Sequence, residues 1–405
     1  MTNKLVRIVW AAVILTVLPV AQAQIFTIVA TFRGGQEGEP DPGMPPLAHD
    51  QAGNLYGASP SGGGSQCYYS TGCGTIYKLD PTGKVTTLYR FSGPPDGSYP
   101  EAVIRDSEGN LYGTTRYGGT AQCSYGIEPG CGTVFKVDAA GKETVLHSFG
   151  GPPDGQNPFA GLVRDAKGNL YGTTYLGGKG SCNSTGCGTV FKIDPAGKET
   201  VLYRFGNGAD GGLPLGNLLL VGGVLYGTTA SGGTGSCTNS VFVGCGTVFN
   251  LKGRKETVLY RFTGPPDGAW PIANVVRDRK GNLYGTASGG GDTINCPLGP
   301  YGCGTVFKLD LARKETILYT FNGQNDGYTI EGLVIDAQGN LYGTAEGPFD
   351  YNSSATTVFK VDTSGQFTVL HSFGTESGYA PGDLIIDHQG NLYGTAVPMV
   401  FKLTP

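Results

Sequence analysis

Short runs of alternating apolar and polar residues, separated by glycine-rich turns, fill most of the chain. The segment from residue 161 to 205 contains four such runs, at residues 161–165, 169–174, 189–194 and 199–205. β-Branched and aromatic residues dominate these runs, which favours strands. No run has the periodicity of an amphipathic helix. Because the pattern leaves no room for crossover helices, the four strands are predicted to form an antiparallel meander.

This four-strand pattern recurs along the whole chain. The tetrapeptide Asn-Leu-Tyr-Gly occurs six times, and Val224-Leu225-Tyr226-Gly227 fills the one gap in the series. The seven tyrosines of the series, spaced by 51 to 59 residues, are Tyr56, Tyr112, Tyr171, Tyr226, Tyr284, Tyr342 and Tyr393. Seven consecutive four-stranded meanders predict an all-β, seven-bladed β-propeller with four-stranded antiparallel blades.

The two ends of the repeat region each contain part of one blade. Residues 25–32 match fourth strands such as residues 143–149, whereas residues 382–387, 391–395 and 399–403 match first, second and third strands. We therefore predict that the N-terminal strand and the last three strands together form the seventh blade. Such closure removes the open strand edges of the ring. The alternative, an open solenoid, would need polar capping repeats at its ends, and none is evident.

The first residues have the pattern of a secretory signal peptide. Lys4 and Arg7 precede an apolar run at residues 8–20, and Ala21-Gln22-Ala23 is a small-residue cleavage motif. The run is shorter than the roughly 20 apolar residues of a membrane span, and the chain has no second run of this kind. We therefore predict a signal peptide at residues 1–23 and one propeller domain at residues 24–405. The protein should be exported, extracellular or periplasmic, without a transmembrane segment.

Composition and charge narrow the range of partners. The 70 glycines are interspersed with aromatic and β-branched residues, as expected of an all-β protein with many tight turns. Loss of Lys4 and Arg7 with the leader would change the net charge from −4 to −6. Nucleic acids and anionic membrane surfaces attract basic proteins, so neither is an expected partner. The chain is expected to be a monomer.

Several sequence blocks resemble those of a known family. Gly-Asn-Leu-Tyr-Gly-Thr-Thr, Gly-Cys-Gly-Thr-Val-Phe-Lys, Val-Leu-Tyr-Arg-Phe and Pro-Pro-Asp-Gly are similar to the blocks of the bacterial tandem-repeat family called choice-of-anchor, GloVer-containing. The resemblance covers nearly the whole chain after residue 23. It implies exported repeat proteins that often carry a C-terminal surface anchor. No such anchor follows the last predicted strand, so attachment by that route is not expected. The family implies no particular activity.

Ten cysteines fall into five local pairs within the loops between second and third strands. The predicted disulfides are Cys67 with Cys73, Cys123 with Cys131, Cys182 with Cys187, Cys237 with Cys245, and Cys296 with Cys303. An even cysteine count with this regularity in an exported protein favours disulfides. A metal site is the alternative, but these loops contain neither histidine nor a Cys-x-x-Cys motif. No metal or other cofactor is therefore expected.

Both the cysteine loops and the connections between blades should lie on one face of the ring. Five connections contain Asp-Gly pairs, at Asp96, Asp154, Asp210, Asp267 and Asp326. These pairs are typical of β-turns, and calcium binding by their carboxylates is the alternative. Short turns such as residues 106–109 occupy the opposite face, which is expected to be inert. Any binding function should therefore belong to the face with the braced loops.

Two groups of residues are candidates for ligand binding on that face. First strands line the channel of a propeller, so their initial residues should form a polar, mildly acidic mouth suited to a hydroxyl-rich or cationic ligand, or simply to water. These mouth candidates are Glu101, Asn217, Asn274, Glu331 and Asp383. Loop tyrosines are the second group, because aromatic rings stack on sugars or anchor proteins, and otherwise cover their own blades. These tyrosines are Tyr69, Tyr117, Tyr175 and Tyr301.

Catalytic motifs are scarce in the sequence. There is no Gly-x-Ser-x-Gly elbow, phosphate loop or Ser-His-Asp grouping. His147 and His371 replace tyrosines of fourth strands and should be packing residues. We therefore predict a non-enzymatic binding or structural propeller that engages a glycan or a protein through the disulfide-braced face. The alternatives are a carbohydrate-active lyase or hydrolase using Glu101, Glu331 or Asp383, and a purely structural envelope protein.

Overall fold

The computed structural model describes most of the predicted domain. The described residues are 24–32, 46–64, 67, 72–123, 129–239, 241–297, 299–324, 326–346, 357–373, 382–396 and 398–405. The predicted signal peptide, residues 1–23, lies outside this part of the chain, so it stays a prediction. Tyr69 also lies outside the described residues.

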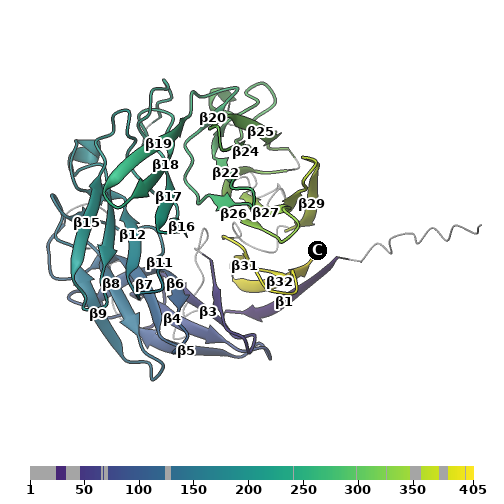
Figure 1. Cartoon of the computed structure of the whole chain (residues 1–405). Coiled ribbons are helices and arrows are strands. Elements are labelled where there is room, and N and C mark those ends of the chain that lie inside the picture. Colours follow the sequence, from purple (N-terminus) through teal and green to yellow (C-terminus); the bar gives the residue numbers. More distant parts are fainter. Residues whose placement is uncertain are drawn as a thin grey trace, which may run out of the picture.

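Seven four-stranded antiparallel sheets surround a common axis, which confirms the predicted propeller (Figure 1). Blade 1 contains β2 (Ala48–His49), β3 (Leu55–Ser59), β4 (Thr75–Leu79) and β5 (Val85–Arg90). Blade 2 contains β6 (Gly97–Arg105), β7 (Leu111–Gly118), β8 (Thr133–Val137) and β9 (Glu143–Ser148). Blade 3 contains β11 (Val163–Arg164), β12 (Leu170–Thr174), β14 (Thr189–Ile193) and β15 (Glu199–Arg204). Blade 4 contains β16 (Leu219–Val221), β17 (Val224–Thr229), β18 (Thr247–Lys252) and β19 (Lys255–Arg261).

The remaining blades have the same order, with first strands innermost and fourth strands outermost (Figure 1). Blade 5 contains β21 (Val276–Arg277), β22 (Leu283–Ala287), β24 (Thr305–Leu309) and β25 (Glu315–Thr320). Blade 6 contains β26 (Tyr328–Ile335), β27 (Leu341–Glu346), β28 (Thr357–Val361) and β29 (Phe367–Ser372). Blade 7 contains β30 (Ile385–Ile386), β31 (Leu392–Ala396), β32 (Met399–Thr404) and β1 (Ile25–Thr31). Two short 3-10 helices occupy Cys182–Ser184 and Gly299–Tyr301. Among the described residues, no helix is long and apolar enough to cross a membrane.

The two ends of the chain close the ring as predicted. β1 pairs antiparallel with β32, and Phe26 lies opposite Leu403 in the register. β32 continues through β31 to β30, so the sheet order is β1-β32-β31-β30. Figure 1 shows β1 along the outer edge of this blade, beside β32. The seventh blade therefore joins residues from both ends of the propeller domain.

Several first strands are shorter than the sequence predicts. Residues 161–165 are predicted to be a strand, but β11 comprises only Val163–Arg164. The preceding residues bond to neighbouring blades instead of extending the ladder. Thr114 Oγ1 of blade 2 donates to the Ala160 carbonyl at 2.9 Å, and the Gly161 N–H donates to Asn217 Oδ1 of blade 4 at 2.6 Å. These inter-blade bonds satisfy the backbone that a longer β11 would have paired with β12.

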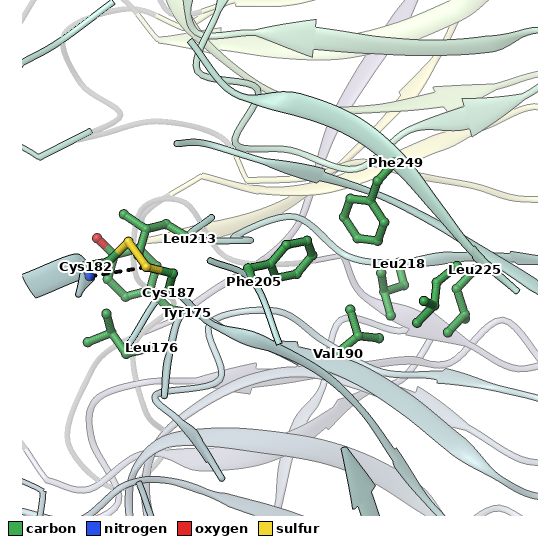
Figure 2. Close-up of a cluster of buried hydrophobic side chains, with 11 residues drawn as sticks. Tyr175, Leu176, Cys182, Cys187, Val190, Phe205, Leu213, Leu218, Leu225 and Phe249 are labelled. Carbon is green, nitrogen blue, oxygen red and sulfur yellow. Dashed lines mark hydrogen bonds between the residues drawn. A yellow bond between two sulfur atoms is a disulfide. The ribbon is translucent and has the colours of Figure 1, made fainter. Parts of the chain in front are cut away.

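The core lies between blades and is built around aromatic pairs. The phenylalanine that ends each fourth strand packs on an aromatic residue in the third strand of the next blade. These pairs are Phe91–Phe135, Phe149–Phe191, Phe205–Phe249, Phe262–Phe307, Phe321–Phe359, Phe373–Phe401 and Phe32–Tyr77. Figure 2 shows the Phe205 and Phe249 pair between blades 3 and 4, beside Leu218 and Leu225. Each pair adds edge-to-face attraction to the burial of two large rings.

The Asn-Leu-Tyr motif itself organises the turns on the face without cysteine loops. In blade 2, Asp106 Oδ1 accepts the Asn110 N–H at 2.9 Å, and Oδ2 accepts the Tyr112 hydroxyl at 3.1 Å. Burial alone would raise the pKa of Asp106, but the hydrogen bonds from Asn110 and Tyr112 hold that pKa below its ordinary value. The same arrangement surrounds Asp50, Asp165, Asp278, Asp336 and Asp387. Blade 4 replaces it with a short Gly222-Gly223 turn.

Candidate functional site

Five disulfides join the cysteine pairs named from the sequence. Each braced loop packs on a connection between blades. A Cβ on Gly151 would lie 3.1 Å from Cys123 Sγ, and a Cβ on Gly264 would lie 2.6 Å from Cys237 Sγ. In blades 3 and 5 the connection also pairs with the loop base, through β10 (Gly155–Gln156) with β13 (Leu176–Gly177) and β20 (Gly268–Ala269) with β23 (Gly289–Gly290). We call this surface of braced loops and connections the disulfide face.

The Asp-Gly pairs of the connections have hydrogen-bonding partners in the protein. Asp96 Oδ2 accepts the Tyr89 hydroxyl at 2.9 Å and the Ser92 N–H at 3.0 Å, and Oδ1 accepts the Gly97 N–H at 2.7 Å. Asp210, Asp267 and Asp326 accept a tyrosine hydroxyl in the same way. These bonds support the turn interpretation over calcium binding. In the part of the chain that the structure describes, no cluster of three or more His, Cys, Asp or Glu side chains could hold a metal.

First strands direct alternate residues into the central channel, with a buried residue between them in every blade. The first of these positions, at the end of the channel on the disulfide face, we call the mouth position. It is occupied by Pro46, Ala102, Gly161, Asn217, Asn274, Gly332 and Asp383. The second position, two residues later, forms a ring that we call the channel collar. It consists of Ala48, Ile104, Val163, Leu219, Val276, Val334 and Ile385.

Three of the predicted mouth candidates occupy mouth positions and bridge neighbouring blades. Asn217 Oδ1 accepts the Gly161 N–H, and Asp383 Oδ1 accepts the Gly332 N–H, both at 2.6 Å. Asn274 Nδ2 donates to the Leu333 carbonyl at 3.3 Å. A side chain at Gly332 would collide with both Asn274 Oδ1 and Asp383 Oδ1, so both oxygens lie next to Gly332 of blade 6.

Glu101 lies one residue before a mouth position and is held by a cation. Its Oε1 accepts from Arg116 Nε at 2.8 Å and from Nη2 at 2.6 Å. The Arg116 guanidinium carbon lies 3.9 Å from the centroid of the Phe159 ring, within cation–π distance. The Asn157 side chain also donates to the Arg116 carbonyl at 3.0 Å. Glu101 therefore belongs to an ordered ion pair within blade 2, next to Phe159 of the connection to blade 3, and does not line the channel cavity.

Glu331 occupies the equivalent place in blade 6, but its neighbours are acidic. Position 346 corresponds to Arg116 of blade 2, since Ile330 pairs with Ala345 as Pro100 pairs with Thr115. Burial raises the pKa of Glu331, and the Asp383 and Glu346 carboxylates raise it further. Burial also raises the pKa of Asp383, an effect that the Gly332 N–H opposes, and it raises the pKa of Glu346 to about 7. The three carboxyl groups therefore favour protonation or a cation.

The tyrosine candidates differ in their surroundings. Tyr117 is buried with its ring centroid 5.7 Å from that of Tyr99, and Tyr175 is buried 5.0 Å from Phe159. Both rings thus act as covers over their own blades. Tyr301 is 43% exposed and lies 5.4 Å from the Trp270 ring. Among the described tyrosines of the group, Tyr301 is the one exposed enough to meet a partner at the surface.

The loops that contact Trp270, in the connection between blades 4 and 5, and the residues next to them include four exposed apolar residues, of which only Tyr301 is a candidate named from the sequence. The Phe242 ring lies 6.3 Å and the Tyr301 ring 5.4 Å from Trp270, so the Cys237–Cys245 and Cys296–Cys303 loops both contact this residue. Val241 (49% exposed) and Val243 (59%) flank Phe242, Tyr301 contacts Trp270 directly, and Ile294 (90%) lies two residues before Cys296. We call these four residues the Trp270 patch. The signal that could have identified it is the presence of valine and isoleucine inside glycine-rich loops.

The face predicted to be inert contains a cavity of its own. It has a volume of about 600 Å³ and lies between the turns of blades 5 and 6. Its charged lining includes Arg277, Arg279 and Lys280, together with Asp278 and Asp336. Both aspartates already accept turn hydrogen bonds. Arg277, Arg279 and Lys280 belong to the end of the first strand and the following turn of blade 5.

A family model accounts for most of the chain. The Gloeobacter/Verrucomicrobia repeat model matches three overlapping regions, residues 16–242, 122–355 and 293–399. The chain belongs to the Gloeobacter/Verrucomicrobia repeat family. This confirms the family resemblance found from the sequence blocks. Together the matched regions reach into all seven blades.

Solved structures similar to this Gloeobacter/Verrucomicrobia repeat protein share little sequence identity with it. A streptogramin B lyase structure has 12% identity and a TM-score of 0.58, with 94% of this chain and 97% of that chain covered. The WD40 propeller domain of Doa1 has 12% identity, a TM-score of 0.56 and the same coverage. The extracellular domain ascribed to a hybrid two-component system of B. thetaiotaomicron has 13% identity and a TM-score of 0.55, over 94% of this chain and 41% of that chain. No curated protein sequence matches. These similarities establish the fold alone.

Proposed function

We propose that this chain is an exported, non-enzymatic binding propeller that engages a protein partner through the Trp270 patch of its disulfide face. The proposal is based on the distribution of exposed apolar side chains over the surface. Eight large apolar residues are exposed among the described residues, and four of them lie in or next to the two loops that contact Trp270. Exposed apolar groups around a buried tryptophan are typical of binding surfaces. Five disulfides support an oxidising, extracytoplasmic location.

The patch is also rigid enough to serve as an anchor. Trp270 is 6% exposed, and its Nε1–H donates to the Gly244 carbonyl at 3.1 Å. Disulfides close both loops that surround it. A loop fixed before binding loses less conformational entropy when a partner docks. The apolar character of Val241, Val243 and Ile294 favours a protein over a glycan, since sugars also require hydrogen-bonding groups around the aromatic ring.

Site-specific crosslinking followed by affinity measurement tests this proposal. A photoreactive residue at position 301 should capture a partner from the extracellular protein fraction, whereas the same residue at the exposed Leu311 on the other face should not. The identified partner is then purified. Its affinity should fall at least about tenfold for the Val241→Ser/Val243→Ser/Tyr301→Ser variant. The matched control Val145→Ser/Leu311→Ser removes exposed apolar groups elsewhere and should bind normally.

Equal binding by the patch variant and the control would reject the patch as the binding surface. A glycan array run in parallel distinguishes the partner classes. Glycan binding that depends on Tyr301, with no protein captured at position 301, would replace the protein partner with a carbohydrate. Binding at another surface would leave the propeller a binding protein with a different site.

The carbohydrate-active enzyme is the second candidate function, and the acidic cluster favours it. Glu331, Glu346 and Asp383 all have raised pKa values, and a protonated carboxyl group near neutral pH can act as a general acid. Incubation with a panel of polysaccharides tests for this activity. Hydrolysis is detected by new reducing ends, and lyase activity by unsaturated sugars. Turnover lost in Glu331→Gln would support the enzyme. A panel without turnover counts against it.

A further inference from the structure

The channel collar is an apolar ring of side chains that lines the central channel. The channel collar contributes a half-buried aliphatic side chain from every blade. The residues between mouth position and collar are buried within the blades, so the collar side chains are those directed at the lumen. The lumen is a cavity of about 410 Å³, a volume in the range of small-molecule sites. An apolar ligand that displaces water from such a ring removes apolar surface from contact with water, which is favourable in free energy.

Polar side chains line both ends of this cavity, with His49 and Arg105 at the end away from the disulfide face. Asn217, Asn274 and Asp383 line it at the disulfide face. Asp383 Oδ1 accepts the Gly332 N–H, while its second carboxylate oxygen has no hydrogen bond among those found between described residues. The cavity therefore has an aliphatic body and a hydrogen-bonding, carboxylate-bearing end.

The charge at that end is unbalanced within the described part of the chain. Glu331 lies close enough to the carboxylates of Asp383 and Glu346 that both raise its pKa, and no cation is paired with it among the described residues. Blade 2 shows the balanced form of the arrangement, in which Arg116 neutralises Glu101. At the opposite end, Arg105 also lines the cavity, but it donates to the Asp106 carbonyl at 3.3 Å and lies 5.4 Å over the Tyr56 ring. Charge complementarity thus selects a cation at the mouth and an apolar group in the collar.

We propose that the channel is a binding site for an amphipathic organic cation, an alkylammonium, whose ammonium group is held by Asp383 and Asn274 and whose alkyl chain lies within the collar. Asp383 supplies a charge-assisted hydrogen bond and Asn274 Oδ1 a second acceptor. The apolar chain covers the half-buried collar side chains. This site is separate from the Trp270 patch, which lies between the loops of blades 4 and 5.

Titration calorimetry with three probes of equal chain length tests the site. Octylammonium should bind with one-to-one stoichiometry and at least about tenfold more tightly than octanol, because a hydrogen bond to a charged group is added. Octanoate should bind more weakly than octanol, since its carboxylate meets Asp383. Burial raises the pKa of Asp383 to about 6, so octylammonium binding should release fewer protons from this carboxyl group near pH 8 than near pH 6, where it is still partly protonated. Proton release is measured by comparing buffers of different ionisation enthalpy.

Two variants separate the polar end from the apolar body. Asp383→Asn keeps the acceptor for the Gly332 N–H and should reduce octylammonium affinity about tenfold while leaving octanol unchanged. Ala48→Leu fills the collar and should weaken both probes. Val163→Ser, which keeps the channel open but removes apolar surface, should weaken both as well. The exposed Val145→Ser is the control and should change neither.

Two results would overturn the proposal. One is the absence of saturable octylammonium binding to the folded protein. The other is equal affinity of octylammonium for the wild type and Asp383→Asn, or for the wild type and Ala48→Leu, with both variants shown to be folded by circular dichroism. Tighter binding of octanoate than of octylammonium would likewise reject the assignment of the charged end.

Discussion

Phe32 of blade 7 packs edge-to-face on Tyr77 of blade 1, with ring centroids 4.9 Å apart. This contact continues the series of aromatic pairs across the point where the ring closes. Phe32 is contributed by the N-terminal strand, so the contact joins the two ends of the propeller as the Phe205–Phe249 pair joins two consecutive blades. The closure therefore uses the same chemistry as every other blade interface.

Phe32→Ala should destabilise the protein about as much as Phe205→Ala. Both rings are buried, and loss of a buried phenylalanine destabilises by roughly 3–5 kcal/mol. Denaturant unfolding monitored by fluorescence gives the two values. Hydrogen exchange should separate the variants, because Phe32→Ala should release β1 and β32 locally. An effect of Phe32→Ala below about 1 kcal/mol would show that the closure contributes little to stability.

The turn aspartates should be required for acid stability. Asp165→Ala removes acceptors for the Asn169 backbone and side chain and for Tyr171, and should destabilise by about 1–3 kcal/mol. Since hydrogen bonds lower the folded pKa of Asp165, its stabilisation is present above the unfolded pKa and is lost as pH falls through the folded value. Thermal unfolding at pH 7 and pH 3 measures this. Val221→Ala in blade 4, which has no such aspartate, is the control and should show no comparable pH dependence.

The fold could be predicted from sequence because each repeat encodes the same local structure. The Asp-x-x-Gly-Asn-Leu-Tyr pattern fixes a turn whose bonds all lie within seven residues, as the partners of Asp106 show. The candidate site was harder to predict from the sequence, because it depends on contacts between repeats. Glu101 meets Arg116 only through the register of two neighbouring strands. Asn217 and Gly161, which are joined by a hydrogen bond, lie a whole blade apart in the sequence. Burial of Tyr117 and Tyr175 has the same origin.

Four glutamates at the start of outer strands should make the protein less stable in alkaline solution. Burial first, and then the carboxylate of a neighbouring connection, raise the pKa of Glu143, Glu199, Glu256 and Glu315 to about 7. Because the folded pKa lies above the ordinary glutamate value of 4.5, their stabilisation is present below about pH 4.5 and is lost as pH rises through about 7. The midpoint of thermal unfolding should therefore fall between pH 5 and pH 8.

Replacement of these glutamates by glutamine isolates their effect. Glu143→Gln and Glu256→Gln should each stabilise by about 0.5 kcal/mol at pH 8, after allowance for solvent screening, and have little effect at pH 5. The exposed Glu108→Gln is the matched control. If the glutamine variants and the control gave the same stability difference between the two pH values, the four glutamates would not be the cause of the alkaline loss.

The disulfides should brace loops more than they stabilise the ring. Cys182 and Cys187 are five residues apart, so the closed loop restrains little of the unfolded chain and should contribute about 2 kcal/mol. Cys182→Ala/Cys187→Ala should lower global stability by that amount. Hydrogen exchange should increase most at the Cys187 N–H, which donates to the Lys179 carbonyl at 2.8 Å. Wild-type protein reduced under native conditions is the control and should show the same local change without the loss of side-chain volume.

A single substitution should convert the acidic pair of blade 6 into the ion pair of blade 2. Glu346→Arg places a guanidinium at the position that corresponds to Arg116, next to Glu331. The cation should lower the folded pKa of Glu331, which the neighbouring acids now raise, and thereby remove part of the alkaline destabilisation. The gain should be about 1–2 kcal/mol at pH 8 and smaller at pH 5. Glu346→Gln removes the acid without adding a cation, so it should give a smaller gain at pH 8. Equal gains from the two variants would show that relief of repulsion, and not a new ion pair, accounts for the effect.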